Sequence, residues 1–464
     1  MDLIASFTET TGEWAGLILG RRLPGTESRR RYTRIAQAVL SAIAGKGVAI
    51  VVSILAVTLT LGYLGAERYG VWMTISAMIA WFNLADLGLA NSLTSALAKA
   101  YGDNRRDIAQ QYVSSILLAF CAIPFALGCV LAAVWPLLDW VSFLNLTTAA
   151  ARTEISPAMA MAFLIFILSF PLSIIPNILG AYQEGALANY WAAAGNLGTL
   201  VGLILVVKLK GGLCWLVAAS MGPLLLVNIL SAVWLFLSYK KWLRPTFAGF
   251  RFDCLKELFG SGSKFFITQI AGILIYNTDN IIIAHYLGAS AVTPYSITWR
   301  LFTYTTLLQT FVHTYLWPTY AEAMARQDTQ WIKRTFRYNL ILAVSSTILL
   351  ALPLVIFGNV IIEKWAGAAA IPPYSLILWM AVWSVMSTAM NVVYSLLCGT
   401  GNMKGVVFYA PAAAVVNIAL SIWLAGAFGI TGVIAATVLS CLFFCFVPSL
   451  LEARSIMSKS ILIS

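Results

Sequence analysis

Residues 277–302 read NTDNIIIAHYLGASAVTPYSITWRLF and determine how the chain can fold. They are typical of the end of one membrane helix, a tight Leu-Gly-Ala turn and the start of the next helix. Asp279 and Arg300 lie inside the two apolar runs. A charged side chain at the centre of a bilayer helix costs roughly 2.5 to 3.5 kcal/mol, so it normally faces a water-filled cavity or a partner. The stretch therefore predicts a membrane hairpin with a functional interior.

The whole chain is too hydrophobic to be a soluble globule. Of its 464 residues, 60% are hydrophobic and 10% are charged. Uncharged windows long enough to cross a bilayer recur along it, for example at residues 108–138, 155–183 and 405–451. The sequence predicts an all-α, polytopic membrane protein with about twelve transmembrane helices.

The tetrad Tyr-Leu-Gly-Ala occurs at residues 63–66 and again at 286–289, each time between two apolar runs. Six predicted helices separate the two copies, and an even number preserves the direction of the chain. We therefore expect two six-helix bundles related by a parallel pseudo-two-fold axis along the membrane normal. The predicted units are a cytoplasmic tail or interfacial amphipathic helix (1–34), an N-terminal bundle (35–237), a basic cytoplasmic linker (238–263), a C-terminal bundle (264–451) and a cytoplasmic tail (452–464).

Basic residues set the predicted orientation. With the N-terminus in the cytoplasm, 22 Lys or Arg residues fall on the cytoplasmic side and five on the other. Both termini are therefore expected in the cytoplasm, with the protein in the inner membrane. The net charge of +11 is explained by this topology, and no nucleic-acid partner is expected.

Polar residues inside the spans are the candidate site. In the first half these are Lys46, Asn83 and Asp86, with Asn83 and Asp86 expected on one continuous helix face. In the second half, Gln269, Tyr276 and Asp279 are expected to share a face, and Arg300 follows on the next helix. Counted from the predicted helix ends, Lys46 lies at the same depth in the membrane as Asp86, and Asp279 lies at the same depth as Arg300.

Two readings of these charges remain open. Each matched pair is either an internal salt bridge that fastens adjacent helices or part of a central cavity. A buried ion pair gains little because desolvation offsets the attraction. In the cavity reading, the cations bind an anionic headgroup and the carboxylates bind a coupling ion, H⁺ or Na⁺.

The sequence offers little for catalysis or metal binding. Seven cysteines are scattered singly through mostly apolar segments, and the chain has two histidines. No Walker-type phosphate loop is present. We expect no catalytic residue, no metal site and no cofactor, so any energy for transport comes from an ion gradient or from consumption of the product.

Two stretches carry a resemblance to a known family. They are residues 277–302 and LGYLGAERYGVWMTISAMIAWFNLADLGLANSLTSALAKAYGDNRRD at 61–107. Both resemble oligosaccharide flippases of the polysaccharide transporter family, such as O-antigen flippases. Their superfamily also holds multidrug extruders and peptidoglycan lipid flippases.

The resemblance implies a flippase for an undecaprenyl-diphosphate-linked oligosaccharide that works by alternating access. Lys46 and Arg300 would then bind the headgroup, membrane lipids would surround the protein, and a polysaccharide polymerase would act downstream. The alternatives are an ion-coupled drug or metabolite extruder and a lipid II-type flippase on the same fold. A membrane-bound glycosyltransferase or ligase would need catalytic acids or a large external domain, which the short loops do not supply.

Overall fold

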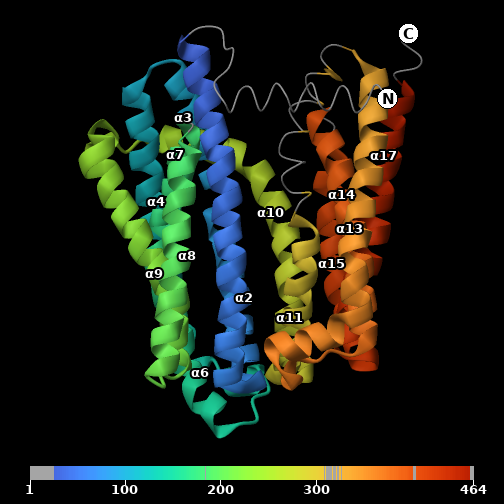
Figure 1. The fold of residues 1–464 in the computed structure, drawn as a ribbon. Coiled ribbons are helices and arrows are strands. Elements are labelled where there is room, and N and C mark those ends of the chain that lie inside the picture. The colour runs from blue at the N-terminus through green and yellow to red at the C-terminus, as the bar shows by residue number, and fades with distance from the viewer. Residues whose placement is uncertain are drawn as a thin grey trace.

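The computed structural model describes residues 26–459 apart from 183, 308, 310–315, 317–319, 321–322, 325–326 and 401–403. Most of the predicted N-terminal tail and the last five residues of the C-terminal tail lie outside this part. Two lobes of helices stand side by side, with their long axes running in the same general direction (Figure 1).

The first lobe contains the helices up to Tyr239. Its elements are α2 (Thr26–Phe82), η1 (Asn83–Asp86), α3 (Leu89–Gly102), α4 (Arg106–Val134), η2 (Trp135–Leu137), α5 (Trp140–Phe143), α6 (Ala149–Ser169), η3 (Phe170–Ile174), α7 (Ile175–Ala181), α8 (Gly185–Lys208), α9 (Leu213–Trp234) and η4 (Leu235–Tyr239). The short turns η5 (Lys241–Leu243) and η6 (Phe247–Gly249) lead to the second lobe.

The second lobe begins with a long helix that also contacts the first. Its elements are α10 (Phe252–Leu287), α11 (Ala289–Thr305), α13 (Thr329–Ala366), η7 (Ala368–Ala370), α14 (Tyr374–Gly399), α15 (Lys404–Phe428), α16 (Ile430–Cys441), η8 (Leu442–Phe446) and α17 (Val447–Lys459). Helix α10 starts inside the stretch 238–263 that the sequence analysis assigns to a linker. It packs against α3 and α4 as well as α11 and α15, so it connects the lobes (Figure 1).

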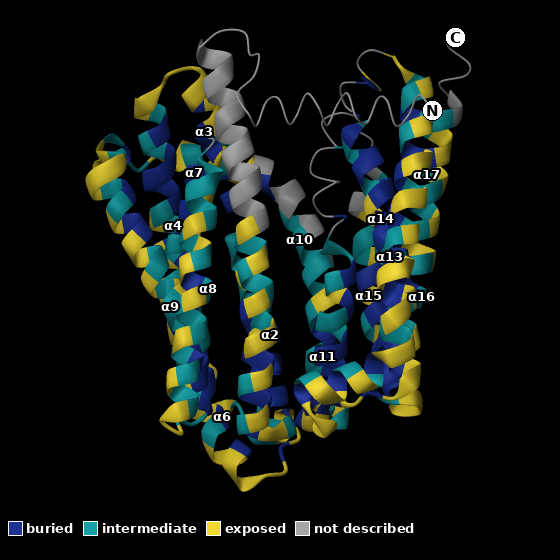
Figure 2. Cartoon of the chain, in the orientation of Figure 1, coloured by how far each residue is buried: buried dark blue, intermediate teal, exposed yellow. Residues whose placement is uncertain are grey.

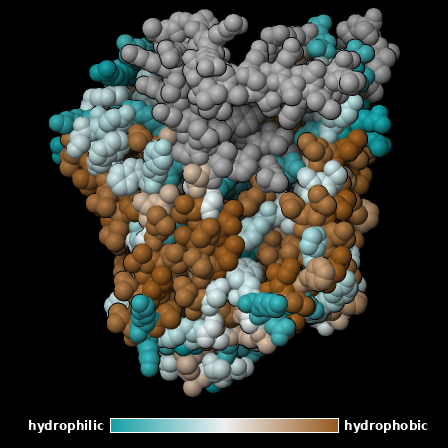
Figure 3. Space-filling view, in the orientation of Figure 1, coloured by the Kyte–Doolittle hydropathy of each residue, from teal (hydrophilic) through white to brown (hydrophobic). Residues whose placement is uncertain are grey.

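The described residues are helical and form a multi-pass membrane protein, as predicted. Nine helices among them are long and apolar enough to cross a membrane, with the two helices merged in α2 counted as one. A band of apolar side chains covers the middle of both lobes, and hydrophilic side chains gather toward the ends (Figure 3). Exposed positions follow the outer faces of α9 and α13, whereas α14 is mostly buried (Figure 2). The count of twelve helices and the repeat stay predictions.

The two Tyr-Leu-Gly-Ala tetrads have similar backbone geometry and lie at the same contact between the lobes. Gly65 has φ 74° and ψ 172°, and Gly288 has φ 90° and ψ 154°. This region is open to glycine but strained for other residues. Thr293 Oγ1 donates a hydrogen bond to the carbonyl of Ala66 at 2.6 Å. The tetrads thus turn the chain where the lobes meet.

This contact is tight and lies at the end of the molecule opposite the described chain ends (Figure 1). A Cβ atom placed on Gly70 would lie 1.7 Å from the carbonyl oxygen of Ala289, so only glycine fits there. His285 Nδ1 also lies 2.8 Å from the carbonyl oxygen of Phe143. The lobes are therefore closed against each other at this end.

Candidate functional site

Arg300 lies where α11 meets the first lobe. It is eleven residues after Ala289, the first residue of α11, or about 16 Å along the helix. Its side chain is partly buried, and its Nη2 lies 3.8 Å from Sδ of Met73 on α2. Because a thioether is a weak acceptor, the guanidinium keeps hydrogen-bonding capacity near mid-membrane depth.

Arg300 and Asp279 do not form the ion pair that one reading of the sequence allowed. The three ion pairs found among the described residues are Arg68–Glu154, Arg105–Asp107 and Lys240–Glu184. The two residues match in depth, but their side chains have different partners. The interpretation that an Asp279–Arg300 salt bridge fastens α10 to α11 is therefore wrong for this conformation.

Asp279 belongs instead to a polar cluster inside the second lobe. The side chain is 2% exposed. Its Oδ2 accepts hydrogen bonds from the hydroxyl of Tyr295 and, at 3.3 Å, from Oγ1 of Thr437. Asn417 Nδ2 donates to the same Thr437 oxygen at 3.0 Å. The cluster joins α10, α11, α15 and α16 around one carboxyl group.

Two oxygens of this cluster lack a partner among the described residues. They are Oδ1 of Asp279 and Oδ1 of Asn417, and both are buried. A buried acceptor without a donor is costly. The arrangement can therefore accept a proton or a small cation that prefers oxygen ligands.

Asn83, Asp86 and Gln269 lie around a break between helices. Gln269 Nε2 donates to the carbonyl of Asn83 at 3.5 Å, which joins α10 to η1. The continuous helix predicted through Asn83 and Asp86 is interrupted after them: α2 ends at Phe82, both residues lie on the short η1, and α3 starts at Leu89. Leu87 and Gly88 interrupt the helix with positive φ angles of 54° and 74°.

The break places a carboxylate beside the start of a helix. Asp86 lies three residues before Leu89, the first residue of α3, and its buried Oδ1 has no partner within the described residues. Discontinuous helices with polar side chains are common at transporter sites. Gly88 also packs closely on α10, since a Cβ there would lie 2.3 Å from the carbonyl oxygen of Gly262.

Lys46 is partly buried on α2, at a different depth from Arg300. It precedes the bend at Gly65 by nineteen residues, or about 28 Å along the helix. Arg300 is about 16 Å from its corresponding turn. The two predicted headgroup cations therefore lie at two levels and do not form one clamp.

Tyr276 is 46% exposed and contacts two aromatic side chains of the same lobe. Its ring centroid is 6.4 Å from that of Trp299 and 6.0 Å from that of Trp383. Asp279 follows three positions later on α10 but is buried, so the two side chains have different environments. Of the three residues predicted to share this face, Tyr276 is exposed, Gln269 is partly buried and Asp279 is buried.

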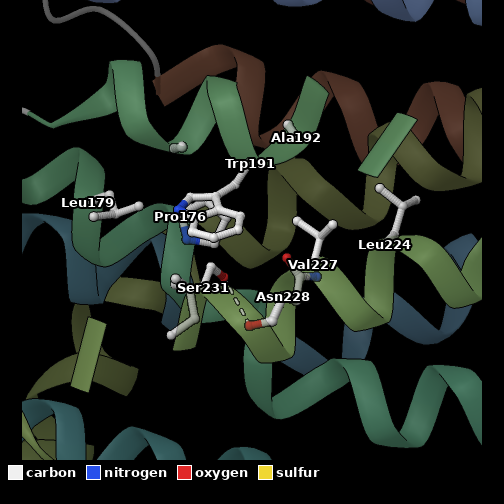
Figure 4. Close-up of a pocket in the computed structure, with 10 residues that line it drawn as sticks. Pro176, Leu179, Trp191, Ala192, Leu224, Val227, Asn228 and Ser231 are labelled. Atoms are coloured by element: carbon white, nitrogen blue, oxygen red, sulfur yellow. Dashed lines mark hydrogen bonds between the residues drawn. The ribbon is translucent and has the colours of Figure 1, made fainter. Parts of the chain in front are cut away.

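Two cavities lie away from these residues. One of about 90 Å³ in the first lobe lies between α7, α8 and α9, and Figure 4 shows Trp191 and Pro176 on one side and Val227 and Asn228 on the other. A groove of about 520 Å³ is lined only by apolar residues of α13, α14, α16 and η8. Neither contains a predicted site residue, so neither is assigned to the headgroup.

Sequence reasoning missed Tyr295, Asn417 and Thr437 as site residues. Tyr295 follows the second tetrad, and Thr437 is a polar residue in an apolar window. Asn417 is likewise a single amide within that window. Lone polar residues in apolar spans were a usable signal, but nothing in their spacing connected them to Asp279.

The fold and the charges between its lobes define a transporter-like membrane protein. The chain belongs to the polysaccharide biosynthesis protein family, whose model matches residues 35–324. A Salmonella typhi protein named as an O-antigen transporter is 25% identical over 62% of this chain and 66% of its own length. A Yersinia pseudotuberculosis protein named as an O-antigen export protein is 24% identical, over 86% of this chain and 91% of its own.

Solved structures of the MOP superfamily share the fold. An inward-facing multidrug resistance MATE family transporter matches with a TM-score of 0.76 and 14% identity, covering 91% of this chain and 99% of that one. An outward-facing conformation of a MATE family transporter matches with a TM-score of 0.61 and 14% identity, covering 94% of this chain and 97% of that one. The lipid II flippase MurJ in an inward closed conformation matches with a TM-score of 0.67 and 16% identity, covering 91% of this chain and 90% of that one.

Proposed function

We propose that this chain is a flippase that moves an undecaprenyl-diphosphate-linked oligosaccharide across the inner membrane by alternating access. The observation that carries the proposal is the partly buried Arg300 guanidinium at the contact between the lobes, which has no carboxylate partner among the described residues. The family and its O-antigen relatives support the same substrate class. No catalytic residue is assigned, because transport breaks no bond of the substrate.

A diphosphate is a suitable ligand for Arg300. A guanidinium offers a planar fork of donors that matches phosphate oxygens, and charge-assisted hydrogen bonds are stronger than neutral ones. An uncompensated charge at this depth is costly, and an anionic headgroup offsets that cost. Lys46, about 12 Å further from the closed end along the helices, would meet the headgroup first as a point charge.

Alternating access is supported by where the lobes touch. Thr293 bonds to Ala66, and Gly70 packs on Ala289, at the end opposite the described chain ends. With the orientation predicted from the basic residues, that closed end is periplasmic. The higher TM-score to an inward-facing than to an outward-facing relative fits this assignment.

Coupling to an ion is assigned to Asp279. Its buried Oδ1 and that of Asn417 are free within the described residues, and both belong to the second lobe. Binding of H⁺ or Na⁺ there would change packing between α10, α15 and α16, of which α10 reaches the first lobe. Occupancy could in this way bias the two conformations of the transporter.

An ion-coupled drug or metabolite extruder is the second candidate. The aromatic cluster of Tyr276, Trp299 and Trp383 beside a buried acid favours it. The positive charge of Arg300 opposes it for cationic compounds, because like charges repel.

A binding experiment separates the two candidates. Purified protein is analysed by native mass spectrometry with undecaprenyl-diphosphate-linked oligosaccharide and, separately, with a lipophilic cation. The flippase proposal expects the anionic lipid to bind and Arg300→Gln to weaken it. Binding of the cation alone would instead establish the extruder.

A further inference from the structure

Three aromatic side chains of the second lobe form a platform at the depth of Arg300. They are Tyr276 on α10, Trp299 on α11 and Trp383 on α14. The Trp299 and Trp383 rings stack at 5.9 Å between centroids and 26° between planes. Tyr276 is tilted by 53° and 54° against them. Contacts from three helices hold the rings in place.

One member of the platform is open. Trp383 is 6% exposed and Trp299 is partly buried, whereas Tyr276 is 46% exposed. Tyr276 is eleven residues before the end of α10 at Leu287, so it lies about 16 Å from that end, as Arg300 does from the start of α11. The exposed ring of Tyr276 and the guanidinium of Arg300 therefore lie at about the same depth.

The position of Tyr276 is unusual for a lipid-facing tyrosine. Tyrosines that face lipid gather at the headgroup level, where their hydroxyl is hydrated. Tyr276 lies near mid-depth and is 46% exposed. A tyrosine hydroxyl that faces hydrocarbon is costly, so the exposed side of Tyr276 should meet water or a polar ligand.

Space is available beside the ring. Gly272 is one turn before Tyr276 on the same face of α10, and a Cβ atom placed there would meet nothing within 4 Å. A planar ligand lying on the Tyr276 ring could therefore pass over Gly272 without moving the protein.

We propose that this platform, defined by Tyr276, Trp299 and Trp383, binds the sugar nearest the diphosphate of the transported lipid. The inference rests on the proposed function. One face of a pyranose carries C–H groups with partial positive charge, and the face of an aromatic ring is negative, so the two stack. The Tyr276 hydroxyl can bond a sugar hydroxyl, while Arg300 holds the adjacent phosphate.

The platform would give the transporter a preference for glycosylated lipid. A diphosphate alone satisfies Arg300 but leaves the ring and hydroxyl of Tyr276 without a ligand. Trp299, which stacks on Trp383, directly precedes Arg300 on α11, so the two side chains lie on adjacent faces of that helix. The platform thus provides a chemical reason for selecting loaded over unloaded carrier.

The test compares two lipids on purified protein: undecaprenyl-diphosphate-linked oligosaccharide and undecaprenyl diphosphate. Tyr276→Leu should lower affinity for the first by about 2- to 12-fold, the range measured for one aromatic pair. Affinity for the second should change much less, so the ratio between the lipids falls. Tyr276→Phe, which keeps the ring, should retain most of the ratio.

A second variant works by filling space. Gly272→Leu should weaken binding of the oligosaccharide lipid more than that of the unglycosylated lipid. Gly222→Leu on α9 is the matched control, because a Cβ there also meets nothing within 4 Å. It should leave both affinities unchanged.

The outcomes distinguish the inference from the function on which it rests. An unchanged ratio in both Tyr276→Leu and Gly272→Leu, with normal binding of each lipid, overturns the platform and leaves the flippase proposal intact. Failure of the unmodified protein to bind either lipid overturns both. A lowered ratio in the two variants, but not in Gly222→Leu, supports the platform.

Discussion

Replacing Arg300 with glutamine removes a positive charge from the contact between the lobes with little structural disturbance. The Nη2 of Arg300 contacts Met73 Sδ at 3.8 Å, and such a weak contact contributes little to folding. Glutamine also removes the cost of keeping a charge at mid-membrane depth. We therefore expect near-normal amounts of folded Arg300→Gln protein.

Transport should respond much more strongly. A hydrogen bond to a charged group contributes about 1.5 to 3 kcal/mol, so losing one to a diphosphate corresponds to about a 10- to 150-fold loss of affinity. Glutamine keeps an amide donor but no charge. Arg300→Lys should be intermediate, because lysine binds phosphate as a point charge without the planar fork.

The assay is complementation of a strain that lacks its own O-antigen flippase, with membrane protein abundance measured beside it. Arg337→Gln, an exposed arginine on α13, is the matched control and should complement fully. Asp279→Asn added to Arg300→Gln should not restore activity, because Asp279 bonds to Tyr295 and Thr437 instead. Full activity of Arg300→Gln, or its recovery in the double variant, would refute this reasoning.

The remaining predictions concern gating, coupling and orientation. Gly70→Val should push the lobes apart at the closed end and abolish transport without loss of protein, since a Cβ there lies 1.7 Å from a facing carbonyl oxygen; Gly62→Val, with open space around it, should be silent in the same transport assay. Asp279→Asn should make transport in proteoliposomes insensitive to an imposed H⁺ or Na⁺ gradient, and retained sensitivity would argue against the coupling role. Cysteines at Arg105 and Lys210, both exposed, should react with impermeant reagents from the cytoplasm and the periplasm respectively; the same sidedness for both would contradict the topology.

Much of the fold could be predicted because hydropathy indicates the membrane-spanning helices and glycine indicates the turns between them. Apolar windows of bilayer length gave the all-α membrane class. The two Tyr-Leu-Gly-Ala tetrads were placed between helices, and Gly65 and Gly288 both adopt positive φ there. Their mutual contact was not predictable, since sequence periodicity does not say which helices of two lobes meet.

The pairing of charges could not be predicted, because depth fixes one coordinate of a side chain and leaves its direction around the helix open. Tyr295, which bonds Asp279, and Arg300 are five residues apart on α11. Five residues turn a helix by about 140° from exact register. Arg300 therefore points away from the side where Asp279 is bound.

The long-range contacts of Asp279 could not be predicted from the sequence either. Asn417 and Thr437 join Asp279 only through the packing of α15 and α16 on α10. Gly88 indicated a break after Asp86, but the three-residue spacing of Asn83 and Asp86 favoured a continuous helix. Leu87 has a positive φ, and the adjacent Gly88 packs closely against α10, a contact that local spacing does not predict.

Flipping of a fluorescent undecaprenyl-diphosphate-linked oligosaccharide in proteoliposomes tests the central claim most directly. Dye in the outer leaflet is quenched chemically, and protected dye reports lipid that has changed leaflets. The flippase account predicts that the unmodified protein speeds this exchange, that Arg300→Gln largely abolishes it, and that Arg337→Gln does not. Equal rates for protein-free vesicles and vesicles with the unmodified protein, or equal rates for the unmodified protein and Arg300→Gln, would contradict it.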